Sequence, residues 1–191
     1  MRLFAAVLPP KDVVAELVRW VGELRAGVGD VGGVRWTGWE GWHYTLAFYG
    51  EVDDGVVPEL SARLAKAARR SAPFSLALRG GGQFGAGRVL WAGAAGDLAA
   101  LRLLADRAEA AARKAGLDTG EHRRYRPHLT LARSRTDTDL GAYVDGLAGF
   151  TGREWTVGEL ALVRSSLPVS GVPGERPRYE AVGRWALGGA G

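Results

Sequence analysis

The stretch His43-Tyr44-Thr45-Leu46-Ala47-Phe48, here called the first motif, decides how the rest of the chain is interpreted. It returns from position 128 as His128-Leu129-Thr130-Leu131-Ala132-Arg133, the second motif, at an offset of 85 residues and with four of six positions identical. Polar and apolar residues alternate in both copies, which predicts two β-strands. Side chains two residues apart share one face of a strand, so each copy presents a histidine beside a threonine and keeps its other face apolar.

The two histidine–threonine pairs suit the cleavage of a phosphodiester. In-line displacement at phosphorus needs a base for the attacking water, an acid for the leaving oxygen, and donors for the non-bridging oxygens. Histidine, with an ordinary pKa of about 6.5, can make either proton transfer near neutral pH. We therefore predict His43 and His128 as catalytic residues and Thr45 and Thr130 as phosphate-binding residues, with no metal and no cofactor.

A single histidine on a strand is more commonly a core residue with its ring hydrogen-bonded. The chain has three histidines, however, and two of them stand in matching six-residue contexts. The third, His122, lies in a polar stretch that we predict as a loop, and it is not a candidate. The sequence also lacks a pair of histidines at the spacing of H-x-x-x-H metal sites.

With its flanking residues, the motif pair resembles the 2H phosphoesterase superfamily and, more narrowly, the bacterial and archaeal RNA 2′,3′-cyclic phosphodiesterases, historically called 2′-5′ RNA ligases. Nearly the whole chain takes part in this resemblance. Besides the two motifs, it is carried by residues 1–7, 34–36, 49–52, 89–93, 125–127 and 178–187. The offset between the motifs itself predicts two similar lobes that each contribute one motif strand to a shared cleft. In agreement, the resemblance implies a single α+β domain over residues 1–191, with two pseudo-symmetric lobes, antiparallel-rich sheets, helices outside and one central cleft.

The resemblance also implies an activity, the metal-independent hydrolysis of RNA 2′,3′-cyclic phosphate ends to 2′-phosphates. The 3′ oxygen then leaves, and on that basis we expect His43 to be the general acid and His128 the general base. Reversible 2′-5′ RNA ligation by the same residues is an alternative, since it is the reverse reaction with a hydroxyl in place of water. Non-catalytic binding of RNA or nucleotide phosphates is a second alternative, from a different class of function.

Two arginines compete for the substrate phosphate. The resemblance places Arg133, five positions after the second motif histidine, near the phosphate. Strict alternation along a strand points Arg133 away from His128 and Thr130, so it would need a strand end or a bulge to reach the site. Arg126 lies two positions before His128, so on a regular strand its side chain would share the face of His128, and it is the second candidate. Pro127, between them, can disturb this alternation.

Composition predicts a soluble protein of the cytoplasm. Hydrophobic residues make up 47% and charged residues 24% of the 191 residues, as in ordinary globular domains. The chain has no apolar run of about 18 residues, no signal-peptide pattern and no cysteine. We therefore expect no membrane partner and a monomer.

The charge balance favours an anionic partner. The formal net charge is +4, and arginine far outnumbers lysine among the 25 basic residues. Five arginines lie around the second motif: Arg123, Arg124, Arg126, Arg133 and Arg135. They could form a basic rim for RNA ends or cyclic nucleotides, although a solvated loop surface would have the same composition.

Periodicity predicts the remaining elements. Helices are expected over residues 11–26, 53–70, 97–114 and 137–148, and further strands over 2–8, 34–36, 74–79, 88–92, 154–164 and 178–187. The glycine-rich residues 80–87 are predicted as a hairpin loop. Their G-x-G-x-x-G match is not a dinucleotide site, because it leads into a strand rather than a helix. Trp39 and Trp42, just before the first motif, are candidates for stacking a nucleobase.

Overall fold

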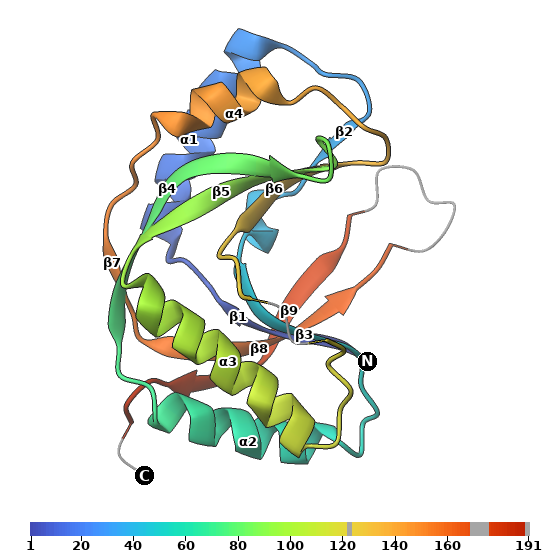
Figure 1. The fold of residues 1–191 in the computed structure, drawn as a ribbon, viewed down its shortest axis with the longest axis vertical. Coiled ribbons are helices and arrows are strands. Elements are labelled where there is room, and N and C mark those ends of the chain that lie inside the picture. The colour runs from blue at the N-terminus through green and yellow to red at the C-terminus, as the bar shows by residue number, and fades with distance from the viewer. Residues whose placement is uncertain (122–123, 169–175, 190–191) are drawn as a thin grey trace.

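The computed structural model describes residues 1–121, 124–168 and 176–189, and forms an α+β fold with four α-helices and a nine-stranded sheet in these ranges (Figure 1). His122 and Arg123 lie outside the described residues. The strands are β1 (Arg2–Val7), β2 (Val34–Trp36), β3 (Tyr44–Glu51), β4 (Phe74–Phe84), β5 (Val89–Gly96), β6 (Leu129–Ser134), β7 (Trp155–Val157), β8 (Glu159–Ser166) and β9 (Arg178–Ala186). The helices are α1 (Lys11–Val28), α2 (Val57–Arg69), α3 (Leu98–Lys114) and α4 (Gly141–Ala148), with a short 3-10 helix η1 (Trp39–Gly41).

The sheet consists of two antiparallel halves that meet at the motif strands. Its strand order is β7-β4-β5-β6-β3-β1-β8-β9, and β2 pairs with the remaining edge of β6. We call β3, β1, β8 and β9 the β3 half, and β6, β5, β4, β7 and β2 the β6 half. Between them, the described chain pairs β3 with β6 through one Cα pair, Tyr44 with Leu129. This weak join lets the halves diverge while it keeps the two motif strands adjacent.

Two pairs of helices cover the two halves. Helices α2 and α3 pack on β3, β8 and β9, whereas α4 packs on β4 and α1 packs on α4. Figure 1 accordingly shows α1 with α4 at one end of the molecule and α2 with α3 at the other. The chain crosses between halves to achieve this, because α1 follows β1 of the β3 half and α3 follows β5 of the β6 half. The expected two-lobed α+β architecture is confirmed.

The apolar faces of the helices behave mostly as their periodicity predicts. In α1 the residues Val13, Val14, Leu17 and Val21 are buried. Val18 continues the same apolar spacing in the sequence but is 37% exposed, so the buried face of α1 is narrower than periodicity predicts. No helix in the described ranges has the length and hydropathy to cross a lipid bilayer.

The predicted hairpin is present, but most of the glycine-rich stretch is strand, and the turn is confined to residues 85–88. Strand β4 continues through Gly80, Gly81 and Gly82 to Phe84, and the turn to β5 is short. A Cβ on Gly82 would lie 2.4 Å from the ring of Trp91 on the neighbouring strand, and one on Gly81 would lie 2.5 Å from the Trp91 carbonyl oxygen. These glycines therefore make room for Trp91 within the sheet, as glycine does where a neighbour approaches closely.

Several predicted element boundaries were also wrong. Helix α2 begins at Val57, after a turn, rather than at Asp53. Helix α4 begins at Gly141 rather than at Asp137, and Asp137 instead forms an ion pair with Arg88 at 2.8 Å. The predicted strand over 154–164 is divided at Gly158 into β7 and β8, which pair with different halves of the sheet.

Candidate active site

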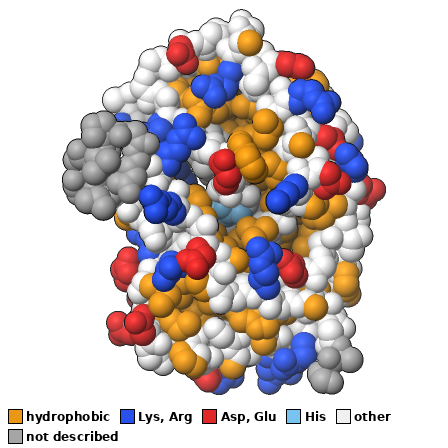
Figure 2. All heavy atoms as spheres, turned by 180° about the vertical axis from the view of Figure 1, so that it is seen from behind, with side chains coloured by type: hydrophobic (Ala, Val, Ile, Leu, Met, Phe, Trp, Pro, Cys, Tyr) orange, Lys and Arg blue, Asp and Glu red, His pale blue; other side chains and the backbone are white. Residues whose placement is uncertain are grey.

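A cavity of about 80 Å³ lies where the two motif strands meet. All four motif histidines and threonines line it, together with Arg133: His43, Thr45, His128, Thr130 and Arg133. Thr37, Gly41 and Tyr179 complete the described lining. In Figure 2, histidine atoms are visible near the middle of the face, with Lys and Arg side chains on several sides. The structure thus brings together the residues that the sequence paired across 85 positions.

The Tyr44–Leu129 pair explains why both histidines and both threonines face one cavity. These two side chains are fully buried on the core face of the sheet. Alternation then turns the residues immediately before and after each of them to the opposite face. In an antiparallel pair the residue before one partner lies opposite the residue after the other, so the register places His43 beside Thr130 and Thr45 beside His128.

A bulge in β6 brings Arg133 to the cavity. Against β5, Leu90 pairs with Ala132 and Trp91 pairs with Thr130, so Leu131 is an extra residue in β6. Leu131 and Ala132 are consequently both buried, and alternation resumes one residue out of step. Arg133 therefore shares the face of Thr130, which removes the parity objection.

The first motif carries the same bulge. Against β1, Ala47 pairs with Ala5 and Thr45 pairs with Ala6, leaving Leu46 extra, and Leu46 and Ala47 are both buried. Phe48 occupies the position that corresponds to Arg133, and it is 50% exposed. The two halves are therefore alike in backbone but differ in charge at this position.

Arg126, the other candidate for the substrate phosphate, lies beside the site but is not among the described residues that line the small cavity. The Arg126 guanidinium carbon lies 4.9 Å from the ring centroid of Phe84. The Phe84 ring in turn meets the His128 ring edge-on, with centroids 5.0 Å apart. The side chain of Arg126 thus contacts Phe84, which itself packs against the second histidine.

Both imidazoles are oriented by the same hydrogen bond. The Nδ1 atom of His43 lies 2.6 Å from the carbonyl oxygen of Gly41, and that of His128 lies 2.7 Å from the carbonyl oxygen of Arg126. A carbonyl oxygen can only accept, so each Nδ1 carries the proton and donates it. Each neutral ring is therefore left with an unprotonated Nε2 for proton transfer.

Aromatic residues hold the His43 ring from two sides. Phe4 stacks on it with centroids 4.6 Å apart, and Tyr179 meets it edge-on at 5.2 Å. A Cβ on Gly41 would lie 2.7 Å from Cε2 of Tyr179, so glycine allows the Tyr179 ring to approach the backbone that hydrogen-bonds His43. Gly41, His43 and Tyr179 consequently form one packed unit.

The surroundings make both histidines weak bases. Burial is the main cause that lowers the pKa of His43 to about 4; the Gly41 hydrogen bond opposes this shift, and the charges of His128 and Arg133 act in the same direction as burial. Burial is also the main cause that lowers the pKa of His128, followed by the charges of Arg133 and Arg126. Near pH 7 both rings of the unliganded site are therefore neutral, and a bound anion would favour their protonation.

Other sequence predictions for the site have mixed outcomes. Trp42 is 7% exposed, so its proposed role in base stacking was wrong. Trp39 is 50% exposed but contributes nothing to the described lining of the cavity. Among the residues that the structure places, no group of three or more His, Asp or Glu side chains could hold a metal ion.

Sequence reasoning did not identify Thr37, Gly41 or Tyr179 as site residues. Thr37 and Gly41 come from the turn before the first motif, and Tyr179 comes from β9, about fifty positions after the second motif. Tyr179 belongs to residues 178–187, which carry part of the family resemblance, but no role in the site could be assigned to it, because the place of all three residues depends on tertiary packing. The catalytic and phosphate-binding roles of the other five residues remain predictions.

Comparison with known proteins connects this chain to one family. The family model described as the 2′-5′ RNA ligase superfamily matches residues 11–167. The RNA 2′,3′-cyclic phosphodiesterase of Thermus thermophilus is 32% identical over 203 aligned positions, which cover 99% of this chain and 91% of that protein. A protein of the same name from Geobacillus stearothermophilus is 32% identical over 163 positions, covering 81% of this chain. The match covers 48% of the Geobacillus protein, so this chain spans about half of its length.

Solved structures extend the similarity to the fold. LigT of E. coli in its apo form matches with a TM-score of 0.75 and 28% identity, covering 97% of this chain and 96% of that chain. The same E. coli protein complexed with 3′-AMP matches with a TM-score of 0.74 and the same identity.

Proposed function

This chain belongs to the 2′-5′ RNA ligase superfamily, and we propose that it hydrolyses RNA 2′,3′-cyclic phosphate ends to 2′-phosphates without a metal ion. The observation that carries the proposal is the pair of imidazoles, each with a free Nε2, in one cavity with two threonines and an arginine. Relatives at about this level of similarity are named RNA 2′,3′-cyclic phosphodiesterase, which supports the same reaction.

In the proposed reaction the two histidines transfer protons on opposite sides of the phosphorus. Nε2 of His128 removes a proton from water as the water oxygen attacks phosphorus. The bond from phosphorus to the 3′ oxygen breaks, and Nε2 of His43 gives its proton to that oxygen. The product carries a 3′-hydroxyl and a 2′-phosphate, and solvent restores the starting protonation of both rings.

Thr45, Thr130 and Arg133 would bind the phosphate in this scheme. Their hydroxyl and guanidinium donors suit the non-bridging oxygens, on which negative charge builds up during attack. The negative charge of the bound phosphate would also raise the lowered pKa values of both histidines. Substrate binding therefore promotes the state with one charged and one neutral imidazole.

The decisive experiment uses an oligoribonucleotide that ends in a 2′,3′-cyclic phosphate. We expect hydrolysis that is unaffected by EDTA, with the product phosphate on the 2′ position. Activity that EDTA abolishes and a divalent ion restores would instead identify a metal-dependent phosphodiesterase. Tight binding without a product would favour the phosphate-binding alternative, and joining to a 5′-hydroxyl strand in preference to hydrolysis would favour ligation.

Substitution of the histidines tests the mechanism in the same assay. His43→Ala and His128→Ala should each lower the rate by about 10²–10⁴-fold, the usual effect of losing a proton-transfer group. His122→Ala, which removes the one histidine without a motif context, is the matched control. Circular dichroism of each variant should match wild type, and near-wild-type turnover by either motif variant would remove that histidine from the mechanism.

A further inference from the structure

A second, larger cavity of about 840 Å³ adjoins the candidate active site. The two cavities share four lining residues, Thr37, Gly41, Arg133 and Tyr179. The larger one extends from there along β2, the segment after β6 and the start of β9. A group bound in the small cavity therefore has a direct continuation into the larger one.

The larger cavity is rich in arginine. One carboxylate lines it, that of Glu40, together with five arginines: Arg35, Arg133, Arg135, Arg176 and Arg178. We call the part lined by these arginines the arginine groove. In the described part of the chain, no carboxylate forms an ion pair with any of them, whereas six other arginines each pair with at least one carboxylate: Arg63, Arg88, Arg113, Arg153, Arg164 and Arg184. The groove thus carries an excess of positive charge, five arginines against the one carboxylate of Glu40.

Two of these arginines lie directly opposite each other in the sheet. Arg35 of β2 and Arg133 of β6 are Cα partners, and both are exposed. Like charges at directly opposite positions destabilise a strand pair. Arg133 lines both cavities, whereas Arg35 lines the larger one, so their charges form a row that leads out of the active site. A polyanion with phosphates at successive positions would compensate both charges.

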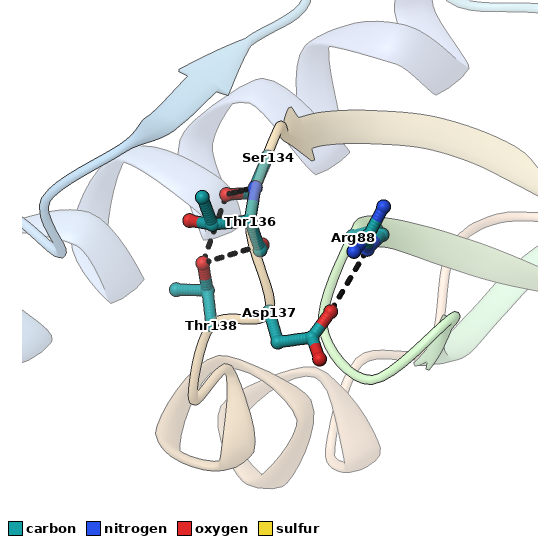
Figure 3. A network of polar contacts seen from close by, with 5 residues as sticks. All are labelled: Arg88, Ser134, Thr136, Asp137 and Thr138. Carbon is teal, nitrogen blue, oxygen red and sulfur yellow. Dashed lines mark hydrogen bonds and ion pairs between the residues drawn. The ribbon is translucent and has the colours of Figure 1, made fainter.

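The wall of the groove that follows β6 is held in place by its own polar contacts (Figure 3). Ser134 Oγ lies 2.8 Å from Thr138 Oγ1, which donates to the Thr136 carbonyl oxygen at 3.0 Å. Asp137 accepts from Arg88 Nε at 2.8 Å, which ties this segment to the β4–β5 turn. Arg135 therefore lies within a segment whose neighbouring residues are hydrogen-bonded to one another and to the β4–β5 turn.

One aromatic ring is available to the groove, that of Tyr179, which lines both cavities. Trp36 also lines the groove, but its ring is packed against Arg25 and Tyr143 and is not offered for stacking. Proteins that bind single-stranded nucleic acids combine a basic groove along the backbone with aromatic rings on which bases stack.

We propose that the arginine groove binds the single-stranded RNA chain on the 5′ side of the cyclic phosphate. A cyclic phosphate is the last group at the 3′ end, so the rest of an RNA substrate must leave the small cavity from its 5′ side. Arg133 then contacts the terminal phosphate and Arg35 the next one upstream. This proposal rests on the proposed function and makes an oligoribonucleotide, rather than a mononucleotide, the preferred substrate.

The test compares 2′,3′-cyclic AMP with an octaribonucleotide that ends in a 2′,3′-cyclic phosphate. For wild type we expect a higher kcat/KM on the octamer. Arg35→Gln should lower that value roughly tenfold, as expected for the loss of one charge-assisted contact, and should leave hydrolysis of 2′,3′-cyclic AMP unchanged. Arg69→Gln, an equal change of charge on α2 of the other half, is the control and should affect neither substrate.

Binding is measured separately from turnover, by fluorescence anisotropy of a labelled octaribonucleotide that ends in a 2′-phosphate. Affinity should fall with salt, and Arg35→Gln should reduce the slope of log K against log salt by about 0.7, the value for one phosphate contact on a single strand. Arg35→Lys should retain the slope. If Arg35→Gln lowers the melting temperature, Arg135→Gln provides the same reading at a second position of the groove.

The outcomes separate the two proposals. Equal kcat/KM on both substrates, or a salt slope in Arg35→Gln equal to that of Arg69→Gln, would overturn the groove and leave the hydrolase intact. Salt-dependent binding of the octamer that requires Arg35, with no hydrolysis of either substrate, would support the groove and overturn the proposed function.

Discussion

Tyr44 and Leu129 form the one Cα pair by which β3 and β6 join within the described chain, and each directly follows a motif histidine. The Tyr44 hydroxyl also donates to the Gly93 carbonyl oxygen of β5 at 2.7 Å, so this side chain reaches from the β3 half into the β6 half. The spacing of the two histidines is therefore set by a buried contact directly beneath them.

The first prediction concerns the pH dependence of catalysis. The productive state of the free site has one charged and one neutral imidazole. Both pKa values are lowered, that of His43 to about 4, so this state is most populated below pH 6.5. We expect a bell-shaped kcat/KM with its maximum below pH 6.5 and a tenfold fall per pH unit on the alkaline side. The maximum of kcat should lie at higher pH, since it reports the complex with the anion. If kcat/KM still rises with pH above pH 7, the predicted maximum below pH 6.5 is contradicted.

The same lowered pKa predicts a loss of stability in acid. The unfolded chain binds a proton at His43 near pH 6.5, whereas the folded chain does so only near pH 4. Stability is therefore fully present above pH 6.5 and is lost as the pH falls toward 4, by roughly 3 kcal/mol from this residue. The free energy of unfolding in urea, measured for wild type and for His43→Gln at pH 7 and at pH 4, gives this loss of stability. The variant should lose less stability over this interval, and parallel losses would show that His43 is not buried in its neutral form.

Arg133 and Arg126 should differ in their effect on turnover. Arg133 lines the cavity, so Arg133→Gln should lower kcat by about 10²–10³-fold, as for removal of a donor to the developing charge. It should also raise the pH optimum, because the charge of Arg133 lowers the pKa of both histidines. Arg126→Gln is the matched control and should cost less than tenfold, since the backbone carbonyl rather than the side chain holds His128. Steady-state kinetics of both variants measures these losses, and a larger loss of kcat in Arg126→Gln than in Arg133→Gln would contradict the prediction.

Gly41 offers a test of how His43 is positioned. In Gly41→Ala the new Cβ would lie 2.7 Å from the Tyr179 ring, so the ring or the backbone that holds His43 must move. A displacement on the order of 1 Å at a catalytic group can cost about 10²-fold in rate, and we expect a loss of kcat of that size. Gly55→Ala, where a Cβ would meet nothing within 4 Å, is the control.

A double-variant cycle shows whether the effect passes through Tyr179. If the clash with the ring is the cause, Gly41→Ala should add little to the loss already produced by Tyr179→Ala. Fully additive losses in kcat would mean that Gly41 acts independently of the ring.

Local sequence patterns were sufficient for the parts of the site that lie on the motif strands. Alternation alone placed each histidine beside its threonine, and the repeat placed the two pairs at one cavity. Arg133 could not be placed in this way, because the bulge at Leu131 depends on the register with β5. The same holds for the glycines of β4, which follow the outline of Trp91 on the next strand. Tyr179 lies in a segment that carries the family resemblance, but its place in the site could not be predicted, since it enters from a strand distant in sequence.

The crossing of the chain between the halves has a consequence for folding during synthesis. Leu3 of β1 pairs with Arg164 of β8, so the β3 half is completed by strands that leave the ribosome long after its first one. The β6 half likewise waits for α4 to cover β4. Contacts of such long range close slowly, and neither half can finish before β8 and α4 have been made. The two imidazoles should therefore reach their final positions only after these later segments have left the ribosome.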